Sequence, residues 1–314
     1  MMLPTIWFIL WGVLWAVYFM LDGFDLGLGT LMPFLAKDDT ERQVIYRAMG
    51  PFWDGNEVWL ITAGGVTFAA FPTTYAVMFS GLYSALMLIL FALILRGVSM
   101  AFRGEVDDPR WRRLWDTGLF LGSFLPALLF GVAFANLFKG IPIDAEGIFQ
   151  GNLLTLLNPY GLAGGILFVL LFLLHGSLWL AVKTHGELHR RAAHLALKTW
   201  PLLLAMAVIF LLATKRWTGL FDNYAAKPVL LLIPVVAVAA LIMIRAFIKR
   251  AQWWKAWFAS SLTIFNSASS PLTLKIMLGV ALTFVPLVIA YQVWVHFLFR
   301  DKVEPEDLAK EEGY

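Results

Sequence analysis

Long apolar runs separated by short charged segments most limit what this chain can fold into. Eight clear candidate spans lie near residues 5–34, 52–71, 75–96, 115–138, 161–182, 193–214, 228–248 and 272–299. A possible ninth, 252–265, is about 14 residues or roughly 21 Å of helix, against a hydrocarbon core of about 30 Å. Helices satisfy their own backbone hydrogen bonds in lipid, whereas a barrel would show short alternating strands. We therefore expect an all-α integral membrane protein, a polytopic bundle of eight to nine transmembrane helices forming one domain over 1–314.

Composition supports membrane residence and excludes several functions. Hydrophobic residues make up 60% of the chain and charged residues 14%, whereas a soluble domain carries roughly 25% charge. The sequence contains no cysteine, which excludes disulfides, thiolate catalysis and iron–sulfur ligation. It also has no phosphate-binding loop, nucleophile elbow or zinc-ligand spacing. The basic residues behind the net charge of +3 lie mostly in loops facing the membrane surface, so we expect a lipid environment and no nucleic-acid partner.

Basic residues alternate between loops, which predicts the orientation of the chain. The loops 35–50, 97–114 and 183–198 are rich in lysine and arginine. In contrast, 72–74 carries no charge and 139–160 has a single basic residue. The positive-inside rule puts the basic loops in the cytoplasm and the N-terminus outside. The side of the carboxyl terminus stays open, because eight crossings leave it outside and nine leave it inside.

Carboxylates within the first apolar run give a functional signal. A charge at the centre of a span costs about 2.5–3.5 kcal/mol on insertion scales, so it usually faces a protein interior and serves function. Asp22 and Asp25 both lie in this run. On a helix they share one face with Trp11, Trp15, Tyr18 and Gly29. We expect this face to pack inward; the alternative role for both aspartates is a structural hydrogen bond between helices.

The second run opens with GPFWDGNEVWLITAGG, in which Asp54 and Glu57 lie three residues apart on one face. Together with Asp25 and with Arg96 at the end of the third run, they form polar groups toward the inner side of the membrane. Such a cluster is typical of a proton-input path. Simpler interpretations are helix capping by Asp54 and Glu57 and extension of Arg96 to the interface.

Histidines test whether this chain binds haem, because an axial imidazole must lie inside a span. Only His175 lies deep in an apolar run. A basic loop holds His185, His189 and His194, and His296 lies near the end of the last span. We therefore expect this chain to hold no haem and no metal by itself.

The motifs LDGFDLGLG and GPFWDGNEVWLITAGG closely resemble subunit II of cytochrome bd-type quinol oxidases. The resemblance continues through FSGLYSALMLILFALILRGVSMAFR, LLNPYGLAGG and SLTIFNSASSPLTLKIMLGVALTFVPLVIAY and covers nearly the whole chain. It implies a subunit of a terminal quinol:oxygen oxidoreductase in a bacterial or archaeal cytoplasmic membrane. The partner, subunit I, would carry haem b and haem d and oxidise quinol from the quinone pool. A small single-helix accessory subunit can join this heterodimer.

The same resemblance implies roles for individual residues. Asp25 and Asp54 match acidic positions of a proton route toward the haems, and Asp22 and Glu57 are further candidates for it. Trp59 matches a tryptophan at the entrance of a proposed oxygen channel. A supporting polar cluster would comprise Arg96, Trp53 and Asn56.

The sequence departs from the family pattern in three places. Some relatives have glutamine at the position of Glu57, and His175 stands where others have a residue that ligates no haem. Over 252–271, two family motifs join directly, without the full eighth helix and outer loop that members usually have. We expect a short or re-entrant segment there, which would keep the carboxyl terminus inside; an inverted last helix is the alternative.

Two other functions stay open at this point. A proton-coupled transporter would also need intramembrane carboxylates and glycine-interrupted helices. A purely structural partner of subunit I would use the same polar residues only as links between helices.

Overall fold

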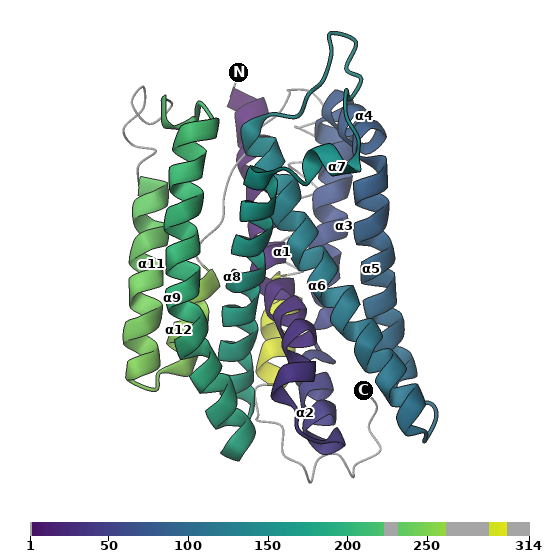
Figure 1. Ribbon diagram of the computed structural model, residues 1–314, viewed down its shortest axis with the longest axis vertical. Coiled ribbons are helices and arrows are strands. Elements are labelled where there is room, and N and C mark those ends of the chain that lie inside the picture. The colour runs from purple at the N-terminus through teal and green to yellow at the C-terminus, as the bar shows by residue number, and fades with distance from the viewer. Residues whose placement is uncertain (1, 223–231, 262–288, 300–314) are drawn as a thin grey trace.

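The computed structural model is a bundle of long helices (Figure 1) and describes residues 2–222, 232–261 and 289–299. In chain order the helices are α1 Met2–Leu35, α2 Asp39–Met49, α3 Trp53–Ala70, α4 Pro72–Gly81, α5 Tyr83–Phe102, α6 Pro109–Lys139, α7 Leu153–Leu156, α8 Pro159–Lys183, α9 Gly186–Trp217, α11 Leu232–Lys249 and α12 Trp253–Ser261. A further helix covers Ile289–Leu298. The expected all-α membrane fold class is confirmed.

Five helices within the described residues are long and apolar enough to cross a membrane, or six if α3 and α4 form one bent span. The chain turns by 119° between α3 and α4, because Pro72 begins α4 and has no N–H with which to continue α3. The expected span 75–96 is thus divided between α4 and α5. Parts of three other expected spans, 228–231, 262–265 and 272–288, lie outside the described residues, so the count of eight to nine stays a prediction.

The basic loops gather at one end of the bundle. In Figure 1, α2, the turn from α5 to α6 and the turn from α8 to α9 lie at the lower end, whereas α4, α7 and the start of α1 lie at the upper end. A single orientation in the membrane therefore brings all three basic loops to the same surface, which is the arrangement that the positive-inside rule favours.

Helix α1 lies at the centre of the bundle and contacts α3, α6 and α8. Its predicted inward face is buried, with Tyr18 and Asp22 fully covered. The close approach to α8 requires glycine: a Cβ added to Gly27 would lie 2.0 Å from the carbonyl oxygen of Phe172. Small residues let transmembrane helices pack at this distance. This packing fixes the position of the α1 carboxylates.

The short helix α12 docks on α8 through His175. The imidazole contacts the Ser260 hydroxyl through Nδ1 at 2.5 Å and the Met20 carbonyl through Nε2 at 2.8 Å. Its ring also stacks on Trp257 of α12, with centroids 5.2 Å apart and planes 8° from parallel. His175 therefore links α1, α8 and α12.

Candidate functional site

Three helices bring the candidate residues together in the interior. Helix α1 supplies Asp22 and Asp25, the first turns of α3 supply Asn56 and Glu57, and α5 supplies Arg96. The backbone at Arg96 is held close to α6, because Gly122 of α6 leaves no room for a Cβ: that atom would lie 2.6 Å from the Arg96 nitrogen. The polar side chains thus project from rigid, closely packed helices.

Arg96 joins two carboxylates from different helices. Its Nη2 donates to Asp22 Oδ1 at 2.8 Å and to Glu57 Oε1 at 2.5 Å. The Asp22 side chain is 0% exposed and the Arg96 side chain 2%, whereas that of Glu57 is 24% exposed. One positive charge therefore faces two carboxylates, and the excess negative charge lies where water is largely excluded. A bound proton can neutralise that excess.

Asp25 is buried without an ion pair to any described residue. Its Oδ2 accepts a hydrogen bond from Asn56 Nδ2 at 2.8 Å, and the same amide donates to the Leu21 carbonyl at 3.1 Å. Asp25 is 1% exposed and Asn56 0%. Asn56 therefore orients the carboxylate from α3, and no cation among the described residues lies within ion-pair distance of it.

Several buried polar atoms in this cluster have no hydrogen-bond partner in the described parts of the chain. They are Asp22 Oδ2, Asp25 Oδ1, Asn56 Oδ1, Arg96 Nε and Arg96 Nη1. Buried polar atoms in proteins are nearly always bonded to protein groups or to ordered water. The cluster therefore has the free donors and acceptors that water molecules or a neighbouring subunit would use.

The arrangement differs in part from the expected grouping of Asp25, Asp54 and Arg96. Arg96 pairs with Asp22 and Glu57, and its burial means that it does not extend to the interface. Asp54 is exposed in the first turn of α3, where it complements the helix dipole. Trp53 is partly buried and lies against Gly97 of α5. The carboxylates thus run from exposed Asp54, through partly exposed Glu57, to the fully buried aspartates.

Trp59 lies two residues beyond Glu57 on α3. It is 3% exposed, and its indole Nε1 is buried without a partner among the described residues. Its neighbours Val58 and Ile61 are exposed on the same helix. Trp59 therefore lies between the interior of the bundle and an apolar surface of α3.

A second ionic network, which the sequence analysis did not identify, joins α2, α5 and α6 at the lower end. Arg103 donates to Asp116 at 2.6 Å and to Asp39 at 2.5 Å, and Arg112 donates to Asp39 at 3.1 Å. Partial burial opposes it, but the hydrogen bond and charge of Arg103 hold the pKa of Asp39 below its ordinary value. Asp39 and Arg103 are 64 residues apart, so no local spacing signals their contact.

The histidine buried deepest in an apolar span, His175, does not fit haem ligation. Both ring nitrogens of His175 are engaged by Ser260 and Met20, so neither is free for iron. His189 and His296 each use Nδ1 in a contact with a backbone carbonyl, and the Nε2 of His296 is buried without a partner among the described residues. Across residues 2–222, 232–261 and 289–299, no group of three or more histidine, aspartate and glutamate side chains could hold a metal.

Comparison with known sequences identifies the family. The profile of the cytochrome bd terminal oxidase subunit II family matches residues 3–265 and 258–299. The chain belongs to this family. It is therefore a multi-pass subunit of a haem-dependent quinol oxidase, an oxidoreductase complex, and acts with a subunit I partner. The two matched stretches overlap over 258–265, within the region 252–271 where the sequence joins two family motifs directly.

Curated relatives cover almost the whole chain. Cytochrome bd-I ubiquinol oxidase subunit 2 of Escherichia coli K12 is 34% identical over 98% of this chain and 97% of its own length. Cytochrome bd ubiquinol oxidase subunit 2 of Bacillus subtilis is 34% identical over 97% and 98%, respectively. The solved bd oxidase of Geobacillus thermodenitrificans has the same fold, with a TM-score of 0.77 at 16% identity over 95% of this chain and 99% of that chain.

Proposed function

We propose that this subunit supplies a proton-input path from the cytoplasm to haems held by its partner. The path runs from Asp54 through Glu57 and Asp22 to Asp25, and Arg96 holds its middle section. The observation that carries the proposal is the graded burial of these carboxylates from an exposed to a fully enclosed position. Intramembrane carboxylates in such series are typical of proton relays.

The chemistry of the cluster favours proton transfer over a purely static link. A static link needs paired groups, yet one arginine faces two carboxylates and Asp25 forms no ion pair with a described residue. The unpartnered oxygens of Asp22 and Asp25 can accept hydrogen bonds from water, which would join the two carboxylates. The orienting contact from Asn56 leaves one oxygen of Asp25 available to carry a proton.

The remaining parts of the reaction fall to the partner. Haem b, haem d and the quinol site are proposed to lie in subunit I; in support, the histidine buried deepest in this chain, His175, has both ring nitrogens engaged. Trp59 is proposed to border an oxygen route, since it separates the bundle interior from an apolar surface. The N-terminus is proposed to lie outside, with the basic loops in the cytoplasm.

The test compares the Asp54→Asn complex with the unmodified one. We expect quinol-driven oxygen uptake to fall by about tenfold or more, while the absorption of the haems per complex stays unchanged. Glu146→Gln is the matched control, because it neutralises an exposed carboxylate in the loop after α6. If the Asp54→Asn complex loses haem in the same proportion as activity, the result would instead support a purely structural role for this subunit. Membership of an oxidase family removes the basis of the transporter alternative.

A further inference from the structure

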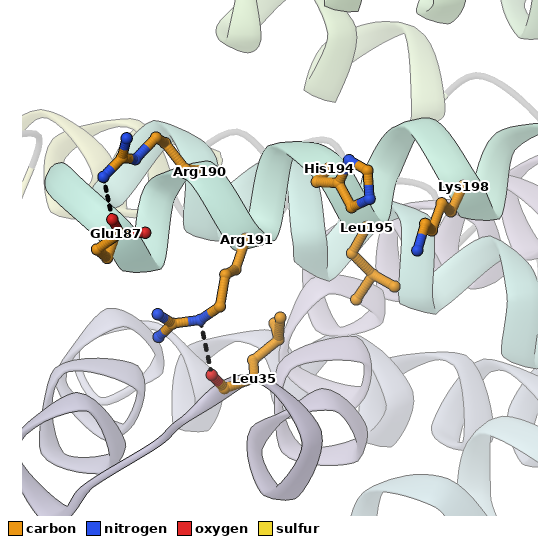
Figure 2. A pocket seen from close by; sticks show the side chains of 7 residues that line it. All are labelled: Leu35, Glu187, Arg190, Arg191, His194, Leu195 and Lys198. Carbon is orange, nitrogen blue, oxygen red and sulfur yellow. Dashed lines mark hydrogen bonds and ion pairs between the residues drawn. The ribbon is translucent and has the colours of Figure 1, made fainter.

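A basic pocket lies outside the carboxylate cluster, where α9 begins beside the end of α1. It has a volume of about 430 Å³ and is bordered by Leu35 of α1 and by α9 residues that include Arg190, His194 and Lys198. Figure 2 shows Arg191 pointing toward Leu35 and Arg190 turned to Glu187, with His194 and Lys198 further along the same helix. Arg190, His194 and Lys198 are all exposed. Because they follow one another at steps of four, they lie on one face of the helix.

Acidic side chains engage two of the basic residues and leave the others free. Arg191 donates to the Leu35 carbonyl at 3.1 Å and pairs with Glu41 at 2.5 Å, and Arg190 pairs with Glu187. Neither His194 nor Lys198 forms a hydrogen bond or ion pair with a described residue. The site has a net charge of +1 if His194 is not counted. The basic side chains are Arg190, Arg191 and Lys198, and the acidic ones are Glu187 and Glu41.

The same face of α9 becomes apolar beyond the pocket. Leu202, Ile209 and Leu212 are all more than half exposed, at 59%, 54% and 64%. Leu212 follows His194 by 18 positions, about five helical turns, and therefore points in the same direction. The chain from Gly186 to Trp217 is a candidate span, so the pocket lies at one membrane surface and the apolar strip runs into the hydrocarbon.

We propose that this pocket binds the phosphate of an anionic phospholipid, with the acyl chains along Leu202, Ile209 and Leu212. The net charge of +1 matches a phosphodiester such as that of phosphatidylglycerol. Lys198 and His194 supply free donors, and Arg190 adds a guanidinium at the rim. A soluble phosphate would satisfy these donors and leave the apolar strip unused. The proposal is independent of the proton path, because α9 contributes no residue to the carboxylate cluster.

The experiment uses the purified complex in nanodiscs of phosphatidylglycerol and phosphatidylcholine, each supplied in turn with a photoactivatable group near the headgroup. Cross-linked peptides are then quantified by mass spectrometry. We expect phosphatidylglycerol to label 186–200 more strongly than phosphatidylcholine. In the double variant Arg190→Gln/Lys198→Gln, the ratio of labelling by phosphatidylglycerol to labelling by phosphatidylcholine should fall by about fivefold for each basic side chain removed. Lys215→Gln/Arg216→Gln, at the other end of α9, is the matched control and should keep the preference.

Three results would overturn the proposal. The first is equal labelling by both lipids in the unmodified complex. The second is a preference that survives the double substitution at Arg190 and Lys198. The third is loss of the preference in the presence of millimolar inorganic phosphate, since a site for free phosphate needs no lipid. Retention of the haem spectrum in both double variants verifies that the complexes compared are intact.

Discussion

At the scale of single residues, Arg96 controls the electrostatics of the interior. It holds Asp22 and Glu57, which come from two other helices, and both Arg96 and Asp22 are almost completely buried. Removing the arginine would leave two carboxylates without a cation in a medium of low polarity. Removing the charge of one carboxylate would leave the other paired. The two kinds of substitution should therefore have very different effects on stability.

We predict that Arg96→Leu lowers the stability of the complex by about 3–5 kcal/mol, because the buried carboxylates lose their partner. Glu57→Gln should cost far less, since its amide oxygen can still accept from Arg96 and the Arg96–Asp22 pair remains. Thermal unfolding of the purified complex measures both effects. Similar unfolding temperatures for the two variants would contradict the assigned role of Arg96.

The sequence identified these residues but not how they pair. Three charged residues were recognisable because each lies in or at the end of an apolar run: Asp22, Asp25 and Arg96. A charge in such a run is costly and is usually functional. The pairing of Arg96 with Asp22 joins positions 74 apart and depends on how α1 and α5 pack. Residue spacing along one helix does not show which residues of two helices form a pair. The sequence therefore grouped Arg96 with Asp54, whereas in the structure it pairs with Glu57.

At the scale of elements, ion pairs fasten α2 to the lower ends of α5 and α6. Asp39 begins α2 and meets Arg103 after α5 and Arg112 on α6, while Asp116 completes the set on α6. Helix α2 is amphipathic, because Val44, Ile45, Tyr46, Ala48 and Met49 are buried in the core of the bundle and its first turn carries the charges. The charged contacts add to this apolar contact and hold the start of α2 against α6 and the residue that follows α5.

We predict that Asp39 stabilises the complex at neutral pH and not in acid. Its pKa is lowered in the folded state, so its contribution is present above the ordinary aspartate pKa of about 3.9 and is lost as the pH falls through the folded value. The melting temperatures of the unmodified and Asp39→Asn complexes should differ at neutral pH and converge below about pH 4. A difference that stays constant with pH would contradict this.

At the scale of the whole molecule, apolar runs and basic loops together define a bundle with one charged end. The sequence predicted the helical class and the alternation of loops, because both follow from the cost of placing polar groups in lipid. It placed a loop at 72–74, where the chain does turn, but it did not predict that Pro72 would begin a separate short helix ending at Gly81. Nor did it predict that His175 would bind α12 in the shortened region 252–271. Its contacts with Met20 of α1 and Ser260 of α12 join residues far apart in the sequence.

The absence of cysteine from the sequence allows a direct test of orientation. We predict that Glu146→Cys, in the loop after α6, reacts with a membrane-impermeant maleimide added to intact spheroplasts. Glu105→Cys, in the loop between α5 and α6, should react only after permeabilisation. Both side chains are exposed, so access rather than burial decides the outcome. Labelling of Glu105→Cys alone in intact spheroplasts would invert the proposed topology.

Buried carboxylates of this subunit are proposed to carry protons to the oxygen-reducing haems of its partner. The most direct test of this proposal is proton uptake during a single turnover, after the fully reduced complex is mixed with oxygen and a pH-sensitive dye. In Asp25→Asn, with an unchanged haem spectrum, we predict that uptake slows by about tenfold or more while oxygen still binds at the unmodified rate. Proton uptake at the unmodified rate in this variant would contradict the account.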